Sequence, residues 1–206
     1  MGRRGGTLRP GEEWGRGAPL PTDSLAVQSD ADAAALVSEA LARGVDPPPI
    51  HLEGGDLWRT LGGRQHAVGE SDRPVSVVDV DVGILSTETL TRTFVAHVVA
   101  GYTWWGRLVA VMNAEWFGRR IVAPGAHPGD GLLDVVEMEL DVRQRIEAFR
   151  RARSGSHLPH PGIRYSRKPS VELVFERPVP VLCDGVRIGR HRRMCVVLDR
   201  TITVSV

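Results

Sequence analysis

Apolar and polar positions divide the chain into two regions with different periods. Between residues 23 and 63, a short apolar run precedes a segment whose apolar side chains recur at helical spacing. Ser29 or Asp30 is suited to cap the start of this helix, and Gly44 is suited to end it. A second short strand, a glycine pair and a helix beginning near Asp56 follow. This order of strand, helix, strand and helix predicts an α/β unit.

From residue 74 onward the pattern changes to short β-branched runs separated by turn residues. Such runs are typical of a β-sandwich or barrel. Residues 141–155 have helical spacing instead, with Val142, Ile146 and Phe149 expected on one side of the helix. The sequence therefore predicts a two-domain α+β fold, in which a shortened α/β N-terminal domain precedes an antiparallel β-sandwich C-terminal domain.

Composition places the domain boundaries. Residues 1–22 are rich in Gly, Arg and Pro and cannot bury enough apolar area to offset ordering, so a disordered tail is predicted there. The change of pattern falls within residues 64–73, which gives an N-terminal domain at 23–72 and a C-terminal domain at 73–206.

Charge and hydropathy exclude several classes of function. The chain has 206 residues and a formal net charge of +1, so no overall field steers it toward nucleic acid. Lys168 is the only lysine, which excludes a P-loop. No segment reaches the roughly 18 apolar residues of a spanning helix, and the N-terminus lacks the apolar core of a signal peptide. We therefore expect a cytoplasmic protein without a nucleic-acid partner.

One stretch, VAPGAHPGDGLLDVVEMEL at residues 122–140, concentrates turn chemistry between two apolar runs. Gly and Pro supply the backbone angles that a sharp reversal requires, so strand, tight loop and strand are predicted. Asp130 lies among the glycines. The residues alone leave open whether this carboxylate does chemistry or caps the turn.

Four stretches of the C-terminal half occur in an order and spacing that resemble the bacterial lipid kinases related to diacylglycerol kinase and sphingosine kinase. These stretches are MNAEWFGRRIVAPGAHPGDGLLDVVEMEL, ARSGSHLPHPGIRY, VELVFERPVPVLCDG and the final TITVSV. The resemblance covers residues 74–206 and, more faintly, 23–63. It implies ATP-dependent transfer of a phosphoryl group to a lipid hydroxyl in a cleft between the two domains.

The resemblance also implies roles for individual residues. Asp184, in VLCDG, matches the general base that takes the proton from the lipid hydroxyl. Asp130 matches an aspartate that binds a structural Mg²⁺ ion, helped by backbone carbonyls such as those of His127 and Leu132. A turn role is the alternative for both aspartates, as a hairpin turn of Asp184 with Gly185 and as an Asx-turn at Asp130.

Two loops that approach nucleotide phosphates in this family are altered here. Gly54 and Asp56 match the second loop, and Gly55 replaces the Asn expected there; two glycines before a helix still open its backbone amides to phosphate. Asp30 matches the aspartate of the first loop, but the sequence SDAD replaces the glycines and adds negative charge, which opposes a polyphosphate unless a cation intervenes. The family's Glu after the general base is Val186. The resemblance implies ATP and Mg²⁺ as cofactors. Because the two loops are altered, an inactive pseudokinase is the alternative.

That alternative is a catalytically inactive relative that binds a lipid, another anion or a protein partner. A lipid substrate or ligand is the expected partner in either case, with peripheral contact to a membrane, and a homodimer is left open. The aromatic rings of Tyr102, Trp104 and Trp105 are suited to contact acyl chains or a membrane interface. We expect them instead to pack in the core or between the domains. An unrelated β-sandwich interaction module would require the four ordered stretches to be coincidence.

Overall fold

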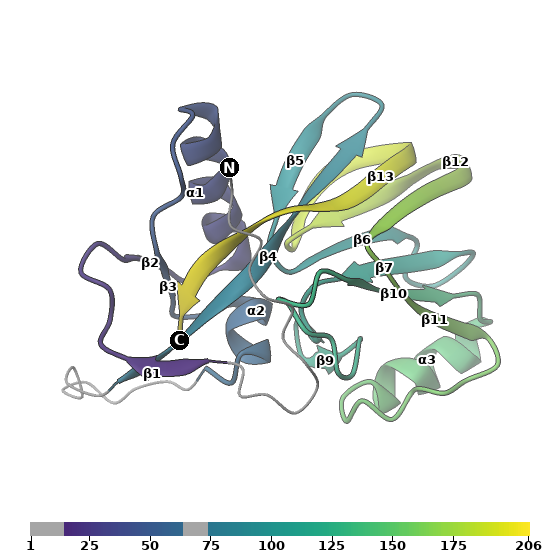
Figure 1. Cartoon of the computed structure of the whole chain (residues 1–206). Helices are drawn as coiled ribbons and strands as arrows, with labels where there is room; N and C mark the ends of the chain where they lie inside the picture. The colour runs from purple at the N-terminus through teal and green to yellow at the C-terminus, as the bar shows by residue number, and fades with distance from the viewer. Residues whose placement is uncertain (1–14, 64–73) are drawn as a thin grey trace.

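The computed structural model describes residues 15–63 and 74–206 (Figure 1). The predicted boundary segment 64–73 and most of the predicted tail lie outside the described residues. The described elements are β1 (Arg16–Ala18), β2 (Leu25–Val27), α1 (Asp30–Ala42), β3 (Ile50–Leu52), α2 (Gly55–Thr60), β4 (Val75–Thr87), β5 (Thr91–Phe94), β6 (His97–Gly101), β7 (Leu108–Met112), β8 (Trp116–Phe117), β9 (Arg120–Ile121), β10 (Leu133–Met138), α3 (Val142–Arg151), β11 (Ile163–Lys168), β12 (Ser170–Cys183) and β13 (Val186–Ser205).

One sheet of 11 strands dominates the described part of the chain. Its main path runs β1-β4-β13-β12-β6-β7-β10-β11, with antiparallel neighbours throughout. Strand β5 pairs with β4, while β3 joins β13 in parallel and β2 joins β3 in parallel. The short strands β8 and β9 form a separate hairpin.

The C-terminal part of this sheet encloses its own core. Buried side chains from β4, β5, β6, β7, β10, β12 and β13 meet in one cluster, so the sheet curls into a sandwich-like body. Val98 and Ala100 on β6 point into this cluster, as the period of 2 along a strand requires. The predicted α+β fold with a C-terminal β-sandwich is therefore confirmed.

The α/β region packs α1 and α2 against β2 and β3, at the opposite side of the molecule from α3 (Figure 1). Its core combines Val37 of α1 and Leu57 of α2 with Val80 of β4 and Val204 of β13. Strands β4 and β13 thus contribute to the cores of both regions. The exact domain limits 23–72 and 73–206 stay a prediction.

Part of the predicted disordered tail is ordered. Residues 16–18 form β1, which pairs with residues 75–77 at the start of β4. The prediction of disorder over 1–22 is wrong at these positions, because backbone hydrogen bonds to a strand edge order a segment that has little apolar surface of its own. Residues 1–14 lie outside the described residues.

The helices begin where the sequence predicts, but α3 turns a different face inward. Ser29 caps α1, and its hydroxyl accepts a hydrogen bond from the Asp32 amide at 3.2 Å. Val142 and Ile146 of α3 are 51% and 47% exposed, whereas Arg145 is fully buried. Of the three apolar residues predicted on one side of this helix, Phe149 packs against the core, whereas Val142 and Ile146 face solvent and the charged side chain of Arg145 lies inward. No helix in the described residues combines the length and apolar character that crossing a membrane requires.

Candidate functional site

Three of the predicted site residues lie together with His97 where the α/β region meets the sandwich. Asp30 begins α1, Asp56 lies in the first turn of α2, His97 begins β6, and Asp184 lies in the turn between β12 and β13. Oxygen and nitrogen atoms of Asp30, Asp56 and His97 lie within 4.8 Å of one another. The Asp184 carboxylate accepts a hydrogen bond from the backbone amide of His97. We call these four residues the acidic cluster.

The Asp184 carboxylate holds the connection between β5 and β6. It accepts hydrogen bonds from the backbone amides of Val95, Ala96 and His97, each at 2.9 Å. The backbone of Asp184 lies in the left-handed region at φ 46°, and Gly185 follows at φ 76°, so the predicted hairpin turn is present. Burial raises the pKa of Asp184 to about 6, against the opposing charge of His97.

The Asp30 carboxylate caps α2 from a distant part of the chain. It accepts hydrogen bonds from the amides of Asp56 at 2.6 Å and Leu57 at 3.1 Å, whereas the N-cap residue Gly54 has no side chain to do so. Gly55 has φ 100°, and a Cβ atom there would lie 2.5 Å from an Asp30 oxygen. A Cβ on Gly54 would lie 2.6 Å from the Gln28 carbonyl oxygen. The lack of a side chain at both glycines therefore lets the Asp30 carboxylate and the Gln28 carbonyl lie close to the backbone.

Asp56 and His97 form a partly buried pair. His97 Nε2 lies 2.9 Å from Asp56 Oδ2, and the Gly118 amide donates to the same carboxylate at 2.9 Å. Burial opposes charge on His97, but the hydrogen bond that His97 donates to Asp56 and the charges of Asp184 and Asp30 raise the pKa of the imidazole. Burial likewise opposes charge on Asp56, yet the hydrogen bond with His97 lowers the pKa of this carboxyl. The imidazolium thus neutralises part of the negative charge of the cluster.

The predicted Mg²⁺ loop lies apart, beside β10 and β11. Asp130 Oδ1 accepts a hydrogen bond from the Leu132 amide at 3.0 Å, which is an Asx-turn, and Asp130 Oδ2 pairs with the guanidinium of Arg167. The His127 carbonyl faces the Asp130 amide at 3.4 Å. Arg167 also contacts Asp134 at 3.2 Å. The Asx-turn that the sequence offered as the alternative is thus present, and binding of Mg²⁺ by this loop stays a prediction.

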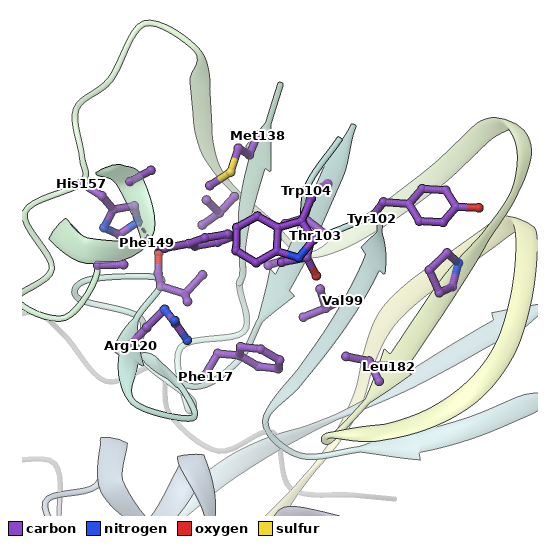
Figure 2. A pocket seen from close by; sticks show the side chains of 18 of the residues that line it. Val99, Tyr102, Thr103, Trp104, Phe117, Arg120, Met138, Phe149, His157 and Leu182 are labelled. Atoms are coloured by element: carbon purple, nitrogen blue, oxygen red, sulfur yellow. Dashed lines mark hydrogen bonds between the residues drawn. The ribbon is translucent and has the colours of Figure 1, made fainter. Parts of the chain in front are cut away.

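A cavity of about 380 Å³ lies between α3 and the sheet (Figure 2). Most of its lining is apolar or aromatic, and among the described residues that line it none is Asp or Glu. Its lining consists of Val99, Gly101, Tyr102, Thr103, Trp104, Trp105, Leu108, Ala110, Phe117, Arg120, Val122, Val136, Met138, Ala148, Phe149, Ala152, His157, Pro180, Leu182 and Arg187. We call this cavity the apolar pocket.

The β8–β9 hairpin connects the apolar pocket with the acidic cluster. Phe117 lines the pocket, and its ring meets the His97 ring edge-on with centroids 4.8 Å apart. The next residue, Gly118, donates its amide to Asp56. A ligand in the pocket would therefore lie one aromatic ring away from the His97–Asp56 pair.

The aromatic segment of the sequence lies at the surface of this pocket. Trp104 and Trp105 line it and are 48% and 60% exposed, so the expected packing within the core is wrong for both. Buried Arg145 holds this segment in place by donating to the carbonyls of Tyr102 and Thr103 at 3.0 and 3.1 Å, and to that of Gly106. The backbone of the segment is thereby fixed while its indole rings face outward.

Sequence reasoning missed three residues of this arrangement. His97 is the single polar side chain in the apolar run FVAHVVAG, and one polar residue in such a run is the feature that could have marked it as a site residue. Phe117 and Arg120 lie in a hairpin whose relation to the pocket depends on long-range packing, and no local pattern marks them.

Comparisons with known proteins agree with this architecture. A family model described as the YegS C-terminal NAD kinase beta sandwich-like domain matches residues 87–206. The fold is similar to a crystal structure of a diacylglycerol kinase from Bacillus anthracis str. Sterne, with a TM-score of 0.64 and 16% identity over 88% of this chain and 75% of that chain. Two further structures from the same organism have TM-scores of 0.66 and 0.68 at 17% and 15% identity, and cover 88% of this chain and 77% of theirs. No curated protein matches the chain.

Proposed function

Because the chain belongs to the family of the YegS C-terminal NAD kinase beta sandwich-like domain, we propose that it is a lipid-binding protein built on a diacylglycerol kinase-like fold. The apolar pocket is the observation that carries this proposal. Its volume of about 380 Å³ falls in the usual range for small-molecule sites, and its lining is apolar with a few polar groups, as such sites generally are. A flexible acyl chain is the ligand class that this lining favours.

The nucleotide side of the fold supports binding without phosphoryl transfer. Helix N-termini attract phosphate through free backbone amides. At α2 the amides of Asp56 and Leu57 already bond to the Asp30 carboxylate, which holds the place that a phosphate oxygen would take. A polyphosphate would have to displace a buried carboxylate and then lie against the remaining acids, which is unfavourable.

Phosphoryl transfer to the bound lipid is the second candidate, and the acidic cluster favours it. A carboxyl group with a pKa near 6, such as that of Asp184, is well placed to act as a general base at neutral pH. The family suggests ATP and a divalent metal as cofactors. However, both oxygens of Asp184 and both oxygens of Asp30 accept backbone hydrogen bonds, so either group would have to give up these bonds to meet a substrate.

Membrane contact fits the same proposal. Trp104 and Trp105 are exposed beside the pocket, and Tyr102 stacks on Trp105 with ring centroids 5.2 Å apart. Aromatic rings of this kind prefer the interface between lipid and water. Arg187 and Arg190 lie close to this surface, Arg187 in the pocket lining and Arg190 over the Tyr102 ring. The surface would bring the pocket to a bilayer that supplies its lipid.

Filling the pocket tests the proposal. We expect the wild type to bind dioctanoylglycerol in a calorimetric titration, and Val99→Trp to lose this binding because the indole occupies the space of the acyl chain. Val174→Trp is the matched control, since Val174 is 54% exposed on β12 and does not line the pocket. Absence of binding by the wild type, or equal binding by Val99→Trp and wild type, would overturn the proposal.

A further inference from the structure

Two polar side chains at one end of the apolar pocket have atoms without partners. Figure 2 places Arg120, Phe149 and His157 at this end, away from Tyr102 and Leu182. Arg120 Nε and His157 Nδ1 are both shielded from solvent, and neither has a hydrogen-bond partner among the described residues. Buried polar atoms in proteins are nearly always bonded, so each unpartnered atom needs an explanation.

Arg120 brings a positive charge to this end. Its guanidinium lies over the Phe149 ring at 5.4 Å, and within the described residues no carboxylate forms an ion pair with it. Arg187, the other arginine of the lining, is exposed to solvent and needs no partner from a ligand. The shielded Nε–H of the half-buried Arg120, beside an aromatic face, therefore favours one negative charge on whatever enters the pocket.

His157 brings an acceptor to the same end. It is 4% exposed, and Nε2 lies 3.1 Å from the Val122 carbonyl oxygen. A carbonyl oxygen can only accept, so Nε2 carries the proton and donates. Burial lowers the pKa of His157, which keeps the imidazole neutral and leaves Nδ1 as a lone-pair acceptor. That atom can be satisfied by a ligand hydroxyl but not by a second anion.

Both groups border the same stretch of backbone. Arg120 lies in β9 and Val122 lies in the bend that follows; both line the pocket, and His157 is hydrogen-bonded to the Val122 carbonyl. Phe117, in the same hairpin, separates this end from the acidic cluster.

Resting on the proposed lipid-binding function, we propose that the pocket selects long-chain carboxylates, with the carboxylate paired to Arg120 and an adjacent hydroxyl donating to His157 Nδ1. A carboxylate matches the shielded Nε–H of the one arginine at this end, whereas a phosphate monoester carries more negative charge than one arginine neutralises. The selected ligand class is therefore a fatty acid, and a hydroxylated fatty acid binds more tightly.

Calorimetric titrations of the full chain with laurate, methyl laurate and 2-hydroxylaurate test this selection. We expect laurate to bind at least about tenfold more tightly than methyl laurate, the range of a charge-assisted hydrogen bond. Arg120→Gln should weaken laurate binding to the level of methyl laurate and so remove this preference, and Arg120→Lys should retain part of it. Arg119→Gln is the control, because Arg119 lies in the same hairpin but is exposed and outside the pocket. Roughly threefold to tenfold tighter binding is expected for 2-hydroxylaurate.

Several outcomes would overturn the selection. Equal binding of laurate and methyl laurate by the wild type would do so, as would a preference that survives in Arg120→Gln. If dioctanoylglycerol binds and laurate does not, the selection fails while the proposed function stands. If none of these lipids binds, the proposed function itself fails. Equal affinity for laurate and 2-hydroxylaurate would remove the role of His157.

Discussion

The carboxylate of Asp30 accepts a hydrogen bond from the backbone amide of Asp56 at 2.6 Å. This bond joins the start of α1 to the start of α2, so the chain caps one helix with the first residue of another. The glycine pair before α2, which resembles a phosphate loop in sequence, leaves room for this carboxylate. The same local sequence can therefore hold an internal anion where a related protein holds a ligand.

Replacing Asp30 with Ala should lower the free energy of unfolding by roughly 1–2 kcal/mol, the usual cost of removing a helix cap. Urea denaturation measures this difference. Asp32→Ala is the control, because Asp32 lies in the same turn of α1 but is exposed, and a change of about 0.5 kcal/mol or less is expected there. Equal effects of the two substitutions would mean that the cap on α2 adds nothing.

Stability should depend on the protonation of Asp184. Burial raises its pKa from 3.8 to about 6, so the folded state holds this proton more tightly than the unfolded state does. The stabilising contribution is therefore complete below about pH 3.8 and is lost as the pH rises through 6. The shift corresponds to about 3 kcal/mol.

Urea denaturation of wild type and Asp184→Asn between pH 4 and 7 tests this dependence. The stability of the wild type relative to the variant should fall as the pH rises across this window, because Asn does not titrate. The variant should also be less stable near pH 4, since its amide nitrogen must face backbone N–H donors. Parallel curves for the two proteins would contradict the assignment.

Arg145 should be essential for the position of the aromatic segment. It is fully buried and donates to the backbone carbonyls of Leu140, Tyr102 and Thr103 at 2.9, 3.0 and 3.1 Å. Lysine cannot reproduce this planar fork, so Arg145→Lys should cost about 2–4 kcal/mol in urea denaturation. Arg150→Lys, on an exposed position of α3, should cost about 0.5 kcal/mol or less. A small effect of Arg145→Lys would show that the segment is held by other contacts.

Exposed indole rings should govern binding to lipid surfaces. The double substitution of Trp104 and Trp105 by Ser should weaken binding to phosphatidylglycerol vesicles at least about tenfold, because each ring buries large apolar area at the interface. Co-sedimentation with vesicles measures this loss. Val174→Ser removes an exposed apolar side chain from β12 and should have no effect. Equal binding by all three proteins would exclude the aromatic surface as the contact.

The sequence predicts the described elements well where local chemistry decides them. The Ser29 cap, the turn at Asp184 and Gly185, and the alternating strands follow from side-chain period and turn residues. The sequence does not predict the inward face of α3, because the carbonyls that bind Arg145 come mainly from a loop about 40 residues earlier. It also does not predict β1, whose order depends on a partner strand.

For the site, the resemblance identified Asp30, Asp56 and Asp184, and the fold brings these three side chains to the same region. It did not predict that Asp30 would bond to the α2 amides, since that contact spans 26 residues. The ion pair of Asp56 with His97 spans 41 residues and has no local signal beyond one polar residue in an apolar run. Long-range pairing of this kind follows from the assembled fold and not from spacing along the chain.

The most direct test of the central claim is thermal unfolding of the wild type in parallel with dioctanoylglycerol and with Mg-ATP. A ligand that binds only the folded state stabilises it by about 2.7 kcal/mol at one hundred times its dissociation constant. We predict that the lipid raises the Tm and that millimolar Mg-ATP does not, because the Asp30 carboxylate holds the α2 amides. A rise with Mg-ATP and none with the lipid would contradict this account.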